Sequence, residues 1–165
     1  MRGRHVDLYL ELRAVVDLLN DAGIDYALCG GLAVGIHGYA RFTKDIDLLV
    51  RKDDLERILT LVRELEFDLP VAHLPFDVGT ERESWVHRVS KAEHGELLSL
   101  DLLGVTPVYE PVWQTRRVLE WRGRPIQVVS REGLAAMKRL AGRGQDRLDL
   151  EKLGFDPNAE GPTLA

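Results

Sequence analysis

The chain has 165 residues, of which 45% are hydrophobic, so it is long and apolar enough for one domain with its own core. Its formal net charge of −5 argues against a grip on nucleic acid that extends over the whole chain. No stretch reaches the roughly 18 uninterrupted apolar residues that a membrane helix needs, and the single cysteine, Cys29, cannot form an internal disulfide. We therefore expect a soluble, cytoplasmic protein without a membrane partner.

The first half of the chain is expected to place helices and strands around a pair of glycines. Apolar residues recur at helical spacing near the N-terminus, and Gly30-Gly31 interrupts a short apolar run. From Asp45 onward, polar and apolar residues alternate before the run becomes apolar, as in a strand. The predicted elements are a helix at 6–19, a strand at 26–29, a glycine turn at 30–31, a helix at 32–37, a strand at 45–50 and a helix at 52–66.

The second half of the chain is expected to hold two hairpins followed by two helices. Because residues 68–83 contain Pro70, Pro75 and Gly79, they are predicted to form an irregular, mobile connection. Ser130 is a predicted helix N-cap. The predicted elements are strands at 84–89 and 97–103, a connection at 107–111, strands at 118–121 and 126–129, and helices at 130–140 and 146–153.

Together these elements predict an α+β or α/β fold with a short mixed β-sheet and helices packed mainly on one side. Residues 1–153 would form a single domain ending in a basic helical segment, 130–153, and residues 154–165 a flexible tail. Positive charge is concentrated in residues 116–147, which hold nine Lys or Arg residues against three acids. That segment suits a polyphosphate or an RNA end, although a solvated helix face would carry the same charges.

Two carboxylates in the second predicted strand are the first candidates for chemistry. Asp45 and Asp47 stand two positions apart, so they project to the same face of a strand while Ile46 and Leu48 point into the core. Paired carboxylates together with substrate phosphates are a habitual environment of Mg2+. The alternative is the solvated face of an ordinary strand, which also alternates polar and apolar residues.

The glycine pair and a third acid add to this pattern. Backbone N–H groups at Gly30 and Gly31, beside a helix N-terminus, are able to hold phosphate, although a double glycine also serves any tight turn. Asp101 is a lone charge inside an otherwise apolar strand, where an unpaired carboxylate is costly. It is therefore a candidate metal ligand or general base, or else an acid paired with an arginine.

These motifs carry a resemblance to a known family. The run Cys29-Gly30-Gly31, then thirteen residues, then Asp45-Ile46-Asp47-Leu48 resembles the signature of the DNA polymerase beta-like nucleotidyltransferase superfamily. Residues 41–47 and 138–149 more narrowly resemble the AbiEii/AbiGii-type (MNT-like) nucleotidyltransferases, many of which are toxins of toxin-antitoxin pairs. The likeness spans about residues 24–153. It implies the nucleotidyltransferase fold.

The resemblance also implies an activity and its residues. It implies transfer of a nucleotidyl group from an NTP with the help of Mg2+ or Mn2+. The metal ligands and catalytic acids that it implies are Asp45, Asp47 and Asp101. The residues that it implies at the triphosphate are Gly30, Gly31 and Lys138. Many relatives carry serine at the position of Gly31, so here no hydroxyl is available to hold the γ-phosphate.

The acceptor and the partners stay open. Arg143 is a further candidate for binding the nucleotide, together with Asp146 and Asp149, although these three residues would equally form a salt-bridge network. A tRNA or other RNA end, a protein side chain and a small molecule such as an aminoglycoside all suit the acid triad, and the basic segment favours RNA. An antitoxin is a possible partner. The rival hypothesis is a catalytically inactive NTP-binding or protein-interaction module.

Overall fold

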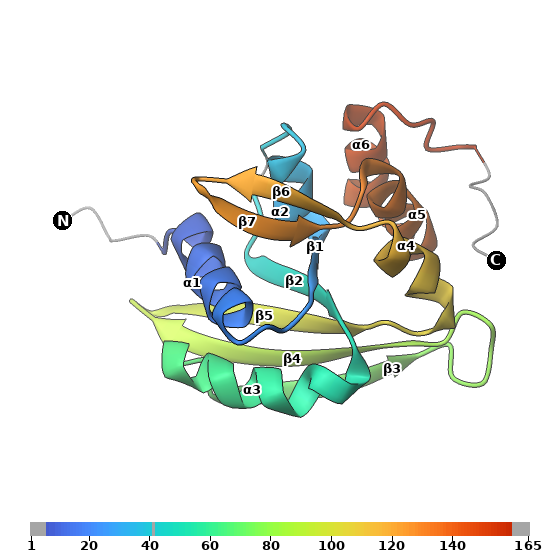
Figure 1. Ribbon diagram of the computed structural model, residues 1–165. Coiled ribbons are helices and arrows are strands. Elements are labelled where there is room, and N and C mark those ends of the chain that lie inside the picture. The colour runs from blue at the N-terminus through green and yellow to red at the C-terminus, as the bar shows by residue number, and fades with distance from the viewer. Residues whose placement is uncertain (1–5, 41, 160–165) are drawn as a thin grey trace.

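The structure is a computed structural model that describes residues 6–40 and 42–159 (Figure 1). The helices are α1 (Leu8–Asp21), α2 (Gly30–Ile36), α3 (Leu55–Val62), α4 (Glu110–Gln114), α5 (Arg131–Ala141) and α6 (Gly144–Lys152), with 3-10 turns at Lys52–Asp54, Arg63–Leu65 and Pro107–Tyr109. The strands are β1 (Ala27–Cys29), β2 (Asp45–Val50), β3 (Leu69–Phe76), β4 (Ser84–Glu93), β5 (Glu96–Gly104), β6 (Arg117–Trp121) and β7 (Arg124–Val128). The α+β class is confirmed.

The strands form one mixed sheet in the order β3-β4-β5-β2-β1-β7-β6. Strands β2 and β5 run parallel, as do β1 and β7, whereas the other neighbouring strands are antiparallel. Both predicted hairpins, β4–β5 and β6–β7, are confirmed. The central position of β2, between β1 and β5, places its carboxylates in the middle of the sheet.

One face of the central strands is apolar. Because side chains alternate along a strand, Ile46 and Leu48 of β2 share this face with Leu100 and Leu102 of β5, and all four are fully buried. Figure 1 shows α1 in front of the sheet and α3 beneath it. The opposite face carries the polar residues of the same strands and is the face on which the site lies.

Helices α1 and α3 cover the apolar face. Asp7 begins α1 as its N-cap, since its carboxylate accepts hydrogen bonds from the backbone N–H groups of Tyr9 and Leu10. The inward side of the helix consists of Leu12, Val15, Val16 and Leu19, all buried. A buried lysine on β4, Lys91, ties the layers together, because its ammonium lies 2.7 Å from the carboxylate of Glu11 in α1.

The segment 68–83 differs from the expected mobile connection, because residues 69–76 form strand β3 and pair with β4. Pro70 and Pro75 predict irregular structure because proline cannot donate a hydrogen bond to a neighbouring strand. Strand β3 lies at the edge of the sheet, and the register shifts between Pro70 and Ala72. An edge strand tolerates proline, since its outer side needs no partner.

Two further boundaries differ from the prediction. The expected connection at 107–111 is helical, because Pro107–Tyr109 and α4 follow one another there, each with proline near its first turn. Helix α2 begins at Gly30, so the glycine pair forms its first turn instead of preceding it. Ser130 caps α5 as expected, accepting a hydrogen bond from the N–H of Gly133.

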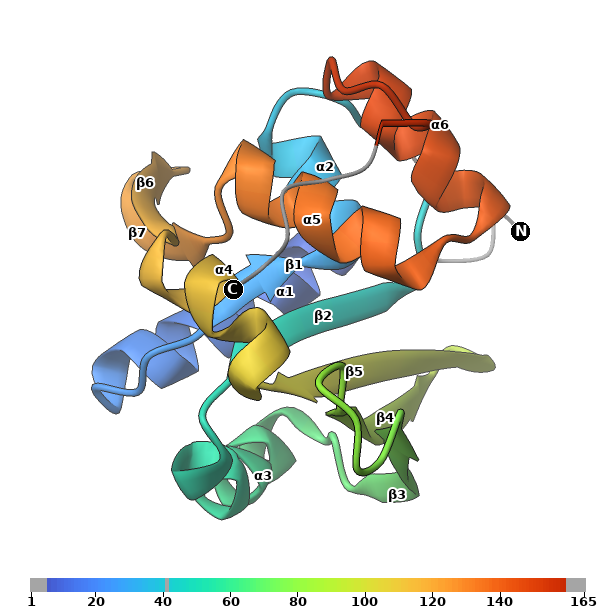
Figure 2. The ribbon, with the colours of Figure 1, turned by 90° about the vertical axis from the view of Figure 1, so that its right-hand side faces the viewer.

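The basic segment 116–147 does not form one surface. Figures 1 and 2 show it divided between the β6–β7 hairpin and the helices α5 and α6, which lie apart from the hairpin. Beyond α6, Phe155 packs against the core and beneath the guanidinium of Arg139, while residues 160–165 of the expected tail lie outside the described residues. None of the helices in residues 6–40 and 42–159 is long and apolar enough to cross a membrane.

Candidate functional site

The three expected acids lie together on the polar face of the sheet. Strands β2 and β5 pair in parallel with Asp47 directly beside Asp101 and with Asp45 beside Ser99. The alternation along both strands turns all three carboxylates to the same face. Asp101 is buried, whereas Asp45 and Asp47 are half-buried. The structure therefore brings the predicted acids into one cluster.

Gly30 presses against this cluster. Its φ of +67° lies in the left-handed region, and a Cβ added there would lie 2.8 Å from the carboxyl carbon of Asp47 and closer still to one of its oxygens. Only glycine meets both conditions, because it has no Cβ and adopts positive φ at little cost. Gly30 therefore leaves room for the carboxylate of Asp47, a role that the spacing of the glycines and acids in the sequence does not predict. Gly31 is buried in the same turn of α2.

Arg88 is the residue that the sequence pattern does not single out. It lies on β4 opposite Asp101, and its Nε and one terminal nitrogen each donate a hydrogen bond of 2.7 Å to a different oxygen of that carboxylate. The same guanidinium lies 3.8 Å from Asp45. The sequence does contain a pattern from which this contact could have been predicted. The tight turn at His94-Gly95 sets the register of the hairpin, and that register puts Arg88 opposite Asp101.

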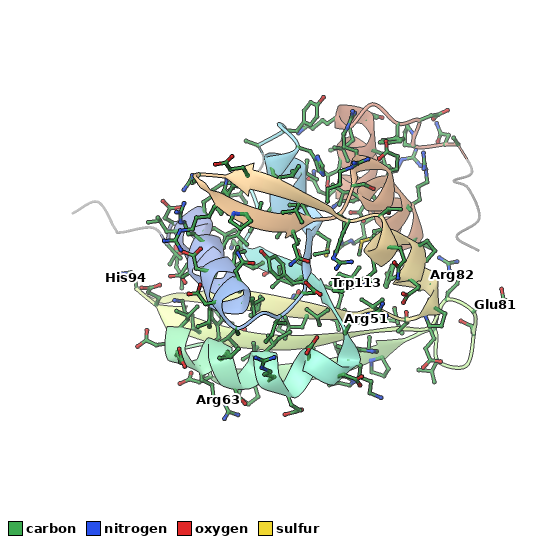
Figure 3. All side chains as sticks on the ribbon, in the orientation of Figure 1. Arg51, Arg63, Glu81, Arg82, His94 and Trp113 are labelled. Carbon is green, nitrogen blue, oxygen red and sulfur yellow. The ribbon has the colours of Figure 1, made fainter. Side chains whose placement is uncertain are left out.

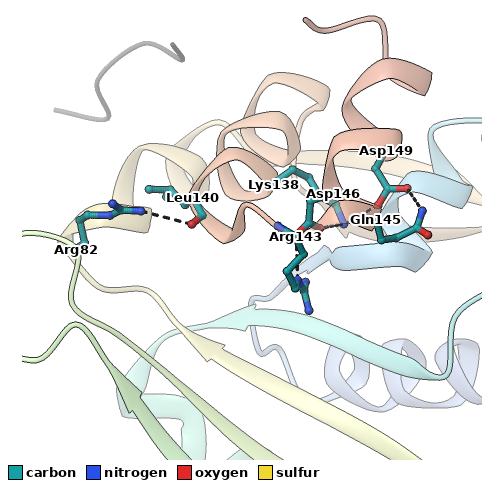
Figure 4. Close-up of polar contacts among 7 residues, drawn as sticks. All are labelled: Arg82, Lys138, Leu140, Arg143, Gln145, Asp146 and Asp149. Atoms are coloured by element: carbon teal, nitrogen blue, oxygen red, sulfur yellow. Dashed lines mark hydrogen bonds and ion pairs between the residues drawn. The ribbon is translucent and has the colours of Figure 1, made fainter. Parts of the chain in front are cut away.

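The basic residues expected at the nucleotide approach the acids from the helices. Lys138 of α5 is only 5% exposed, and its ammonium lies 3.1 Å from Asp146 and 2.9 Å from Asp149 of α6 (Figure 4). Arg143 begins α6 and donates a 2.9 Å hydrogen bond from Nε to Asp146, yet its side chain is 76% exposed. The salt-bridge network that the sequence left open is therefore present, and Arg143 is its solvent-facing member.

The electrostatics of the cluster follow from these positions. Burial, followed by the charges of Asp101 and Asp45, raises the pKa of Asp47 to about 7 even though Lys138 and Arg143 act in the opposite direction. Burial and Asp101 likewise raise the pKa of Asp45. Carboxylates this close resist simultaneous ionisation unless a cation stands among them. The site therefore favours the binding of positive charge.

A divalent cation fits part of this arrangement as it stands. Carboxylate oxygens are the ligands that Mg2+ and Mn2+ prefer, and Asp45 and Asp47 present theirs on one face beside a close-packed glycine. Within residues 6–40 and 42–159, no three His, Cys, Asp or Glu side chains already converge as a metal-binding set. Both oxygens of the third acid, Asp101, accept hydrogen bonds from Arg88. The donor set fits a metal held by Asp45 and Asp47, and Asp101 joins it only when Arg88 moves away.

Two hollows open near the site, and the smaller one reaches Asp47. The smaller, of about 110 Å3, has Gly30, Asp47, Lys138 and Arg143 in its wall. The larger, of about 370 Å3, has walls from β4 and from the loop before it, including Arg82, whose guanidinium donates a hydrogen bond to the carbonyl oxygen of Leu140 in α5. Figure 4 shows this contact at one side of the Lys138 cluster. Tyr109, Ala141 and Arg143 line both hollows, so the two adjoin.

The raised pKa of Asp47 predicts a pH dependence of stability in the metal-free protein. Between about pH 4 and pH 7 the folded chain holds a proton on Asp47 that the unfolded chain has released, so the free energy of unfolding falls as pH rises through this window. Asp47→Asn removes the effect. We expect the variant to exceed the wild type in stability by about 2 kcal/mol at pH 8 and by much less at pH 4. Urea unfolding in EDTA at both pH values measures this, and a gap that is equal at the two pH values would contradict it.

Comparison with known families supplies an independent view of the chain. The sequence profile of a family described as aminoglycoside-2''-adenylyltransferase matches residues 11–153. The matched range includes every residue expected at the site. No curated protein matches the chain in sequence.

Solved structures show the same fold. An antigenic nucleotidyltransferase-like protein from Paracoccidioides brasiliensis superposes with a TM-score of 0.59 and 20% identity, over 89% of this chain and 75% of the other. A Thermotoga maritima protein described as a candidate nucleotidyltransferase gives 0.60 and 19%, over 92% and 95%. ANT(2")-Ia, solved in complex with adenylyl-2"-tobramycin, gives 0.56 and 12%, over 90% and 88%. These likenesses establish the nucleotidyltransferase fold.

Proposed function

The chain belongs to the aminoglycoside-2''-adenylyltransferase family, and from this premise we infer that it transfers a nucleotidyl group from an NTP to an acceptor hydroxyl with the help of Mg2+ or Mn2+. The observation that carries the proposal is the alignment of Asp45, Asp47 and Asp101 on one face of two parallel strands. Membership of the nucleotidyltransferases is shown by the family. The metal, the acceptor and the residue roles are the proposal.

The acids divide the work of the reaction. Asp45 and Asp47 hold the divalent cation, which when bound neutralises charge on the phosphates and on the leaving group. Asp101, next to Asp47, accepts the proton of the acceptor hydroxyl. The hydroxyl oxygen forms a bond to the α-phosphorus while the bond from that phosphorus to the bridging oxygen breaks, so pyrophosphate leaves with the electron pair. Asp101 is available as a base only after its ion pair with Arg88 opens.

The triphosphate is held by backbone and cationic groups at the smaller hollow. The family resemblance places it at Gly30 and Gly31, where only backbone donors are present. The exposed guanidinium of Arg143 is free at its outer end to meet phosphate oxygens, whereas Lys138 is committed to Asp146 and Asp149. We therefore assign direct phosphate contact to Arg143, and to Lys138 a positive potential beside Asp47.

We propose a hydroxyl-bearing small molecule as the acceptor. The family description and the tobramycin adduct in ANT(2")-Ia both concern small-molecule acceptors. The charge argument for RNA is weaker in three dimensions, since the basic segment 116–147 divides between the β6–β7 hairpin and the α5–α6 pair. An RNA or protein acceptor would instead support the narrower AbiEii-type hypothesis, with a role as a toxin and an antitoxin partner.

A transfer assay tests the function and the acceptor together. The protein is incubated with each of the four NTPs, labelled on the α-phosphate, with Mg2+ and one of three acceptors: an aminoglycoside mixture containing tobramycin, total tRNA, or protein from a cell extract. We expect label from ATP on the small molecule and none without Mg2+. Label on tRNA or protein would refute the small-molecule acceptor, and absence of label from every combination would refute the transferase function.

One observation favours the rival, non-catalytic module. Arg88 occupies both oxygens of Asp101 and lies near Asp45, so a side chain of the protein supplies positive charge where the enzyme needs a metal. A module of this kind would bind a nucleotide or a protein without turnover. The two functions differ in one result of the transfer assay, because only the enzyme labels an acceptor in a manner that depends on Mg2+.

A further inference from the structure

Arg88 binds the acid cluster through a two-bond ion pair with Asp101. Its planar guanidinium forms two parallel 2.7 Å hydrogen bonds to Asp101, the arrangement in which an arginine and a carboxylate bind most strongly. The partners lie directly opposite each other on antiparallel strands, so the backbone register keeps them together. The guanidinium stays charged at all relevant pH values, since these bonds and the nearby acids raise its pKa. Arg88 is thus a permanent internal cation in the acid cluster.

This contact competes with a metal for the same atoms. Both oxygens of Asp101 accept hydrogen bonds from Arg88, and the guanidinium lies 3.8 Å from an oxygen of Asp45. A divalent cation held by Asp45 and Asp47 would lie beside this guanidinium and repel it, and Asp101 could give that cation an oxygen only after Arg88 released it. The arginine and the metal therefore cannot both hold Asp101 in the same geometry.

The place to which Arg88 moves follows from its strand. Ser84 and Val86 precede it at alternate positions of β4, so they share its face of the sheet, and both line the larger hollow. Arg88 is the next residue on that face of β4 and lies opposite Asp101, just beyond the lining of the hollow. Arg143, on the far wall, lines both hollows. A polyphosphate that extends from the larger hollow toward the acids would pass Arg143 in the wall and then reach Arg88, the residue that follows Val86 on the same face of β4. Each of these guanidinium groups is able to form two hydrogen bonds to phosphate.

We propose that Arg88 couples nucleotide binding to metal binding: it holds Asp101 while the nucleotide is absent, and it transfers its hydrogen bonds to the phosphates of the NTP when the metal enters. This inference rests on the proposed function and extends it with a substrate-binding residue. Metal alone then binds weakly, because it must displace Arg88. Metal and nucleotide together bind well, because the displaced guanidinium gains a new anionic partner.

The experiment measures binding and does not depend on turnover. Mn2+ is titrated into wild-type protein and Arg88→Gln by isothermal calorimetry, first alone and then with a non-hydrolysable ATP analogue. Without the analogue, we expect Arg88→Gln to bind Mn2+ about tenfold more tightly than the wild type, a difference of about 1.4 kcal/mol. At saturating Mn2+, we expect the variant to bind the analogue about tenfold more weakly. A structural role alone would not produce these opposite changes.

The matched control is Arg51→Gln, which removes another two-bond arginine-carboxylate pair. Arg51 binds Glu110 at 2.7 and 2.8 Å, and its guanidinium lies over the ring of Trp113. Arg51 and Trp113 are labelled in Figure 3. We expect the affinities of Arg51→Gln for Mn2+ and for the analogue to match those of the wild type.

Arg88→Lys serves as the second variant if Arg88→Gln unfolds. Lysine keeps the positive charge but lacks the planar group that forms two hydrogen bonds at once. Arg88→Lys should therefore also bind Mn2+ alone more tightly and the analogue more weakly than the wild type, with smaller changes than Arg88→Gln.

The outcomes separate the inference from the function on which it rests. Unchanged or weaker Mn2+ binding in the folded Arg88 variants would overturn competition at Asp101. Unchanged binding of the analogue would overturn the transfer of Arg88 to the phosphates, and with it the coupling. If the wild type binds Mn2+ and the analogue in either of these cases, the proposed function stands. If neither wild type nor variants bind Mn2+ or the analogue, the proposed function fails and the role of Arg88 fails with it.

Discussion

Asp45→Asn and Asp47→Asn should each lower nucleotidyl transfer by about a thousandfold or more while leaving the fold intact. Each substitution removes a negative charge from the pair that holds the divalent cation, and such a cation contributes several kcal/mol to stabilising the transition state. The fold survives because asparagine has nearly the same shape and relieves the repulsion that raises the pKa of both carboxyls. Initial rates at saturating NTP and Mg2+, compared with the thermal transition of the same samples, measure both parts.

The control for this pair is Asp53→Asn, which changes an exposed acid in the 3-10 turn after β2 and should keep the wild-type rate.

Asp101→Asn in the same assay separates two roles for the third acid. If Asp101 is the base, Asp101→Asn lowers the transfer rate at every metal concentration, whereas if Asp101 is only a metal ligand, raised Mg2+ restores the rate. We expect no rescue. Wild-type rates in Asp45→Asn or Asp47→Asn would remove the metal pair from the mechanism.

Gly30→Ala is expected to be nearly as damaging as loss of an acid, with a fall in transfer of about a hundredfold or more. The added methyl group would overlap the carboxylate of Asp47, so either that side chain or the start of α2 has to move. A displacement of about 1 Å in a positioned catalytic group is enough for a loss of this size. We also expect weaker Mn2+ binding, measured by calorimetry, because Asp47 no longer points beside Asp45.

Gly23→Ala provides a closely matched control for Gly30→Ala. The two glycines have nearly identical backbone conformations, with φ of +68° and +67°, but a Cβ at Gly23 would have nothing within 4 Å. Both substitutions therefore carry the cost of a left-handed alanine, of order 1 kcal/mol, and only one disturbs Asp47. If Gly23→Ala and Gly30→Ala lower stability equally and neither lowers activity, the close approach of Gly30 to Asp47 has no catalytic importance.

Several features of this protein were determined by local sequence alone. The alternation from Asp45 to Val50 predicts the strand and places both acids on one face, because the period of two is a property of any extended chain. Likewise the turn at His94-Gly95 predicts the β4–β5 hairpin, and Ser130 predicts the start of α5. Each of these features depends on residues close to one another in the chain, so a short window contains the information.

Other features were decided only when the sheet assembled. Parallel pairing of β2 with β5 joins Asp47 to a residue 54 positions later, and no local pattern specifies which strand becomes the neighbour of β2. Strand β3 forms despite its two prolines because it lies at an open edge, which is a property of the strand order. Lys138 reads as a phosphate-binding residue in the sequence, yet α6 packs against α5 and buries its ammonium between two aspartates.

The contact between Arg88 and Asp101 depends on both the local sequence and the tertiary structure. The hairpin register, which is local, makes the two residues cross-strand neighbours. Whether their ion pair matters depends on the tertiary structure, because the pairing of β5 with β2 places Asp45 and Asp47 beside it and Asp101 is buried in the assembled fold. Charges interact strongly only where water is partly excluded and other charges lie within a few ångströms, and those conditions exist only in the assembled fold.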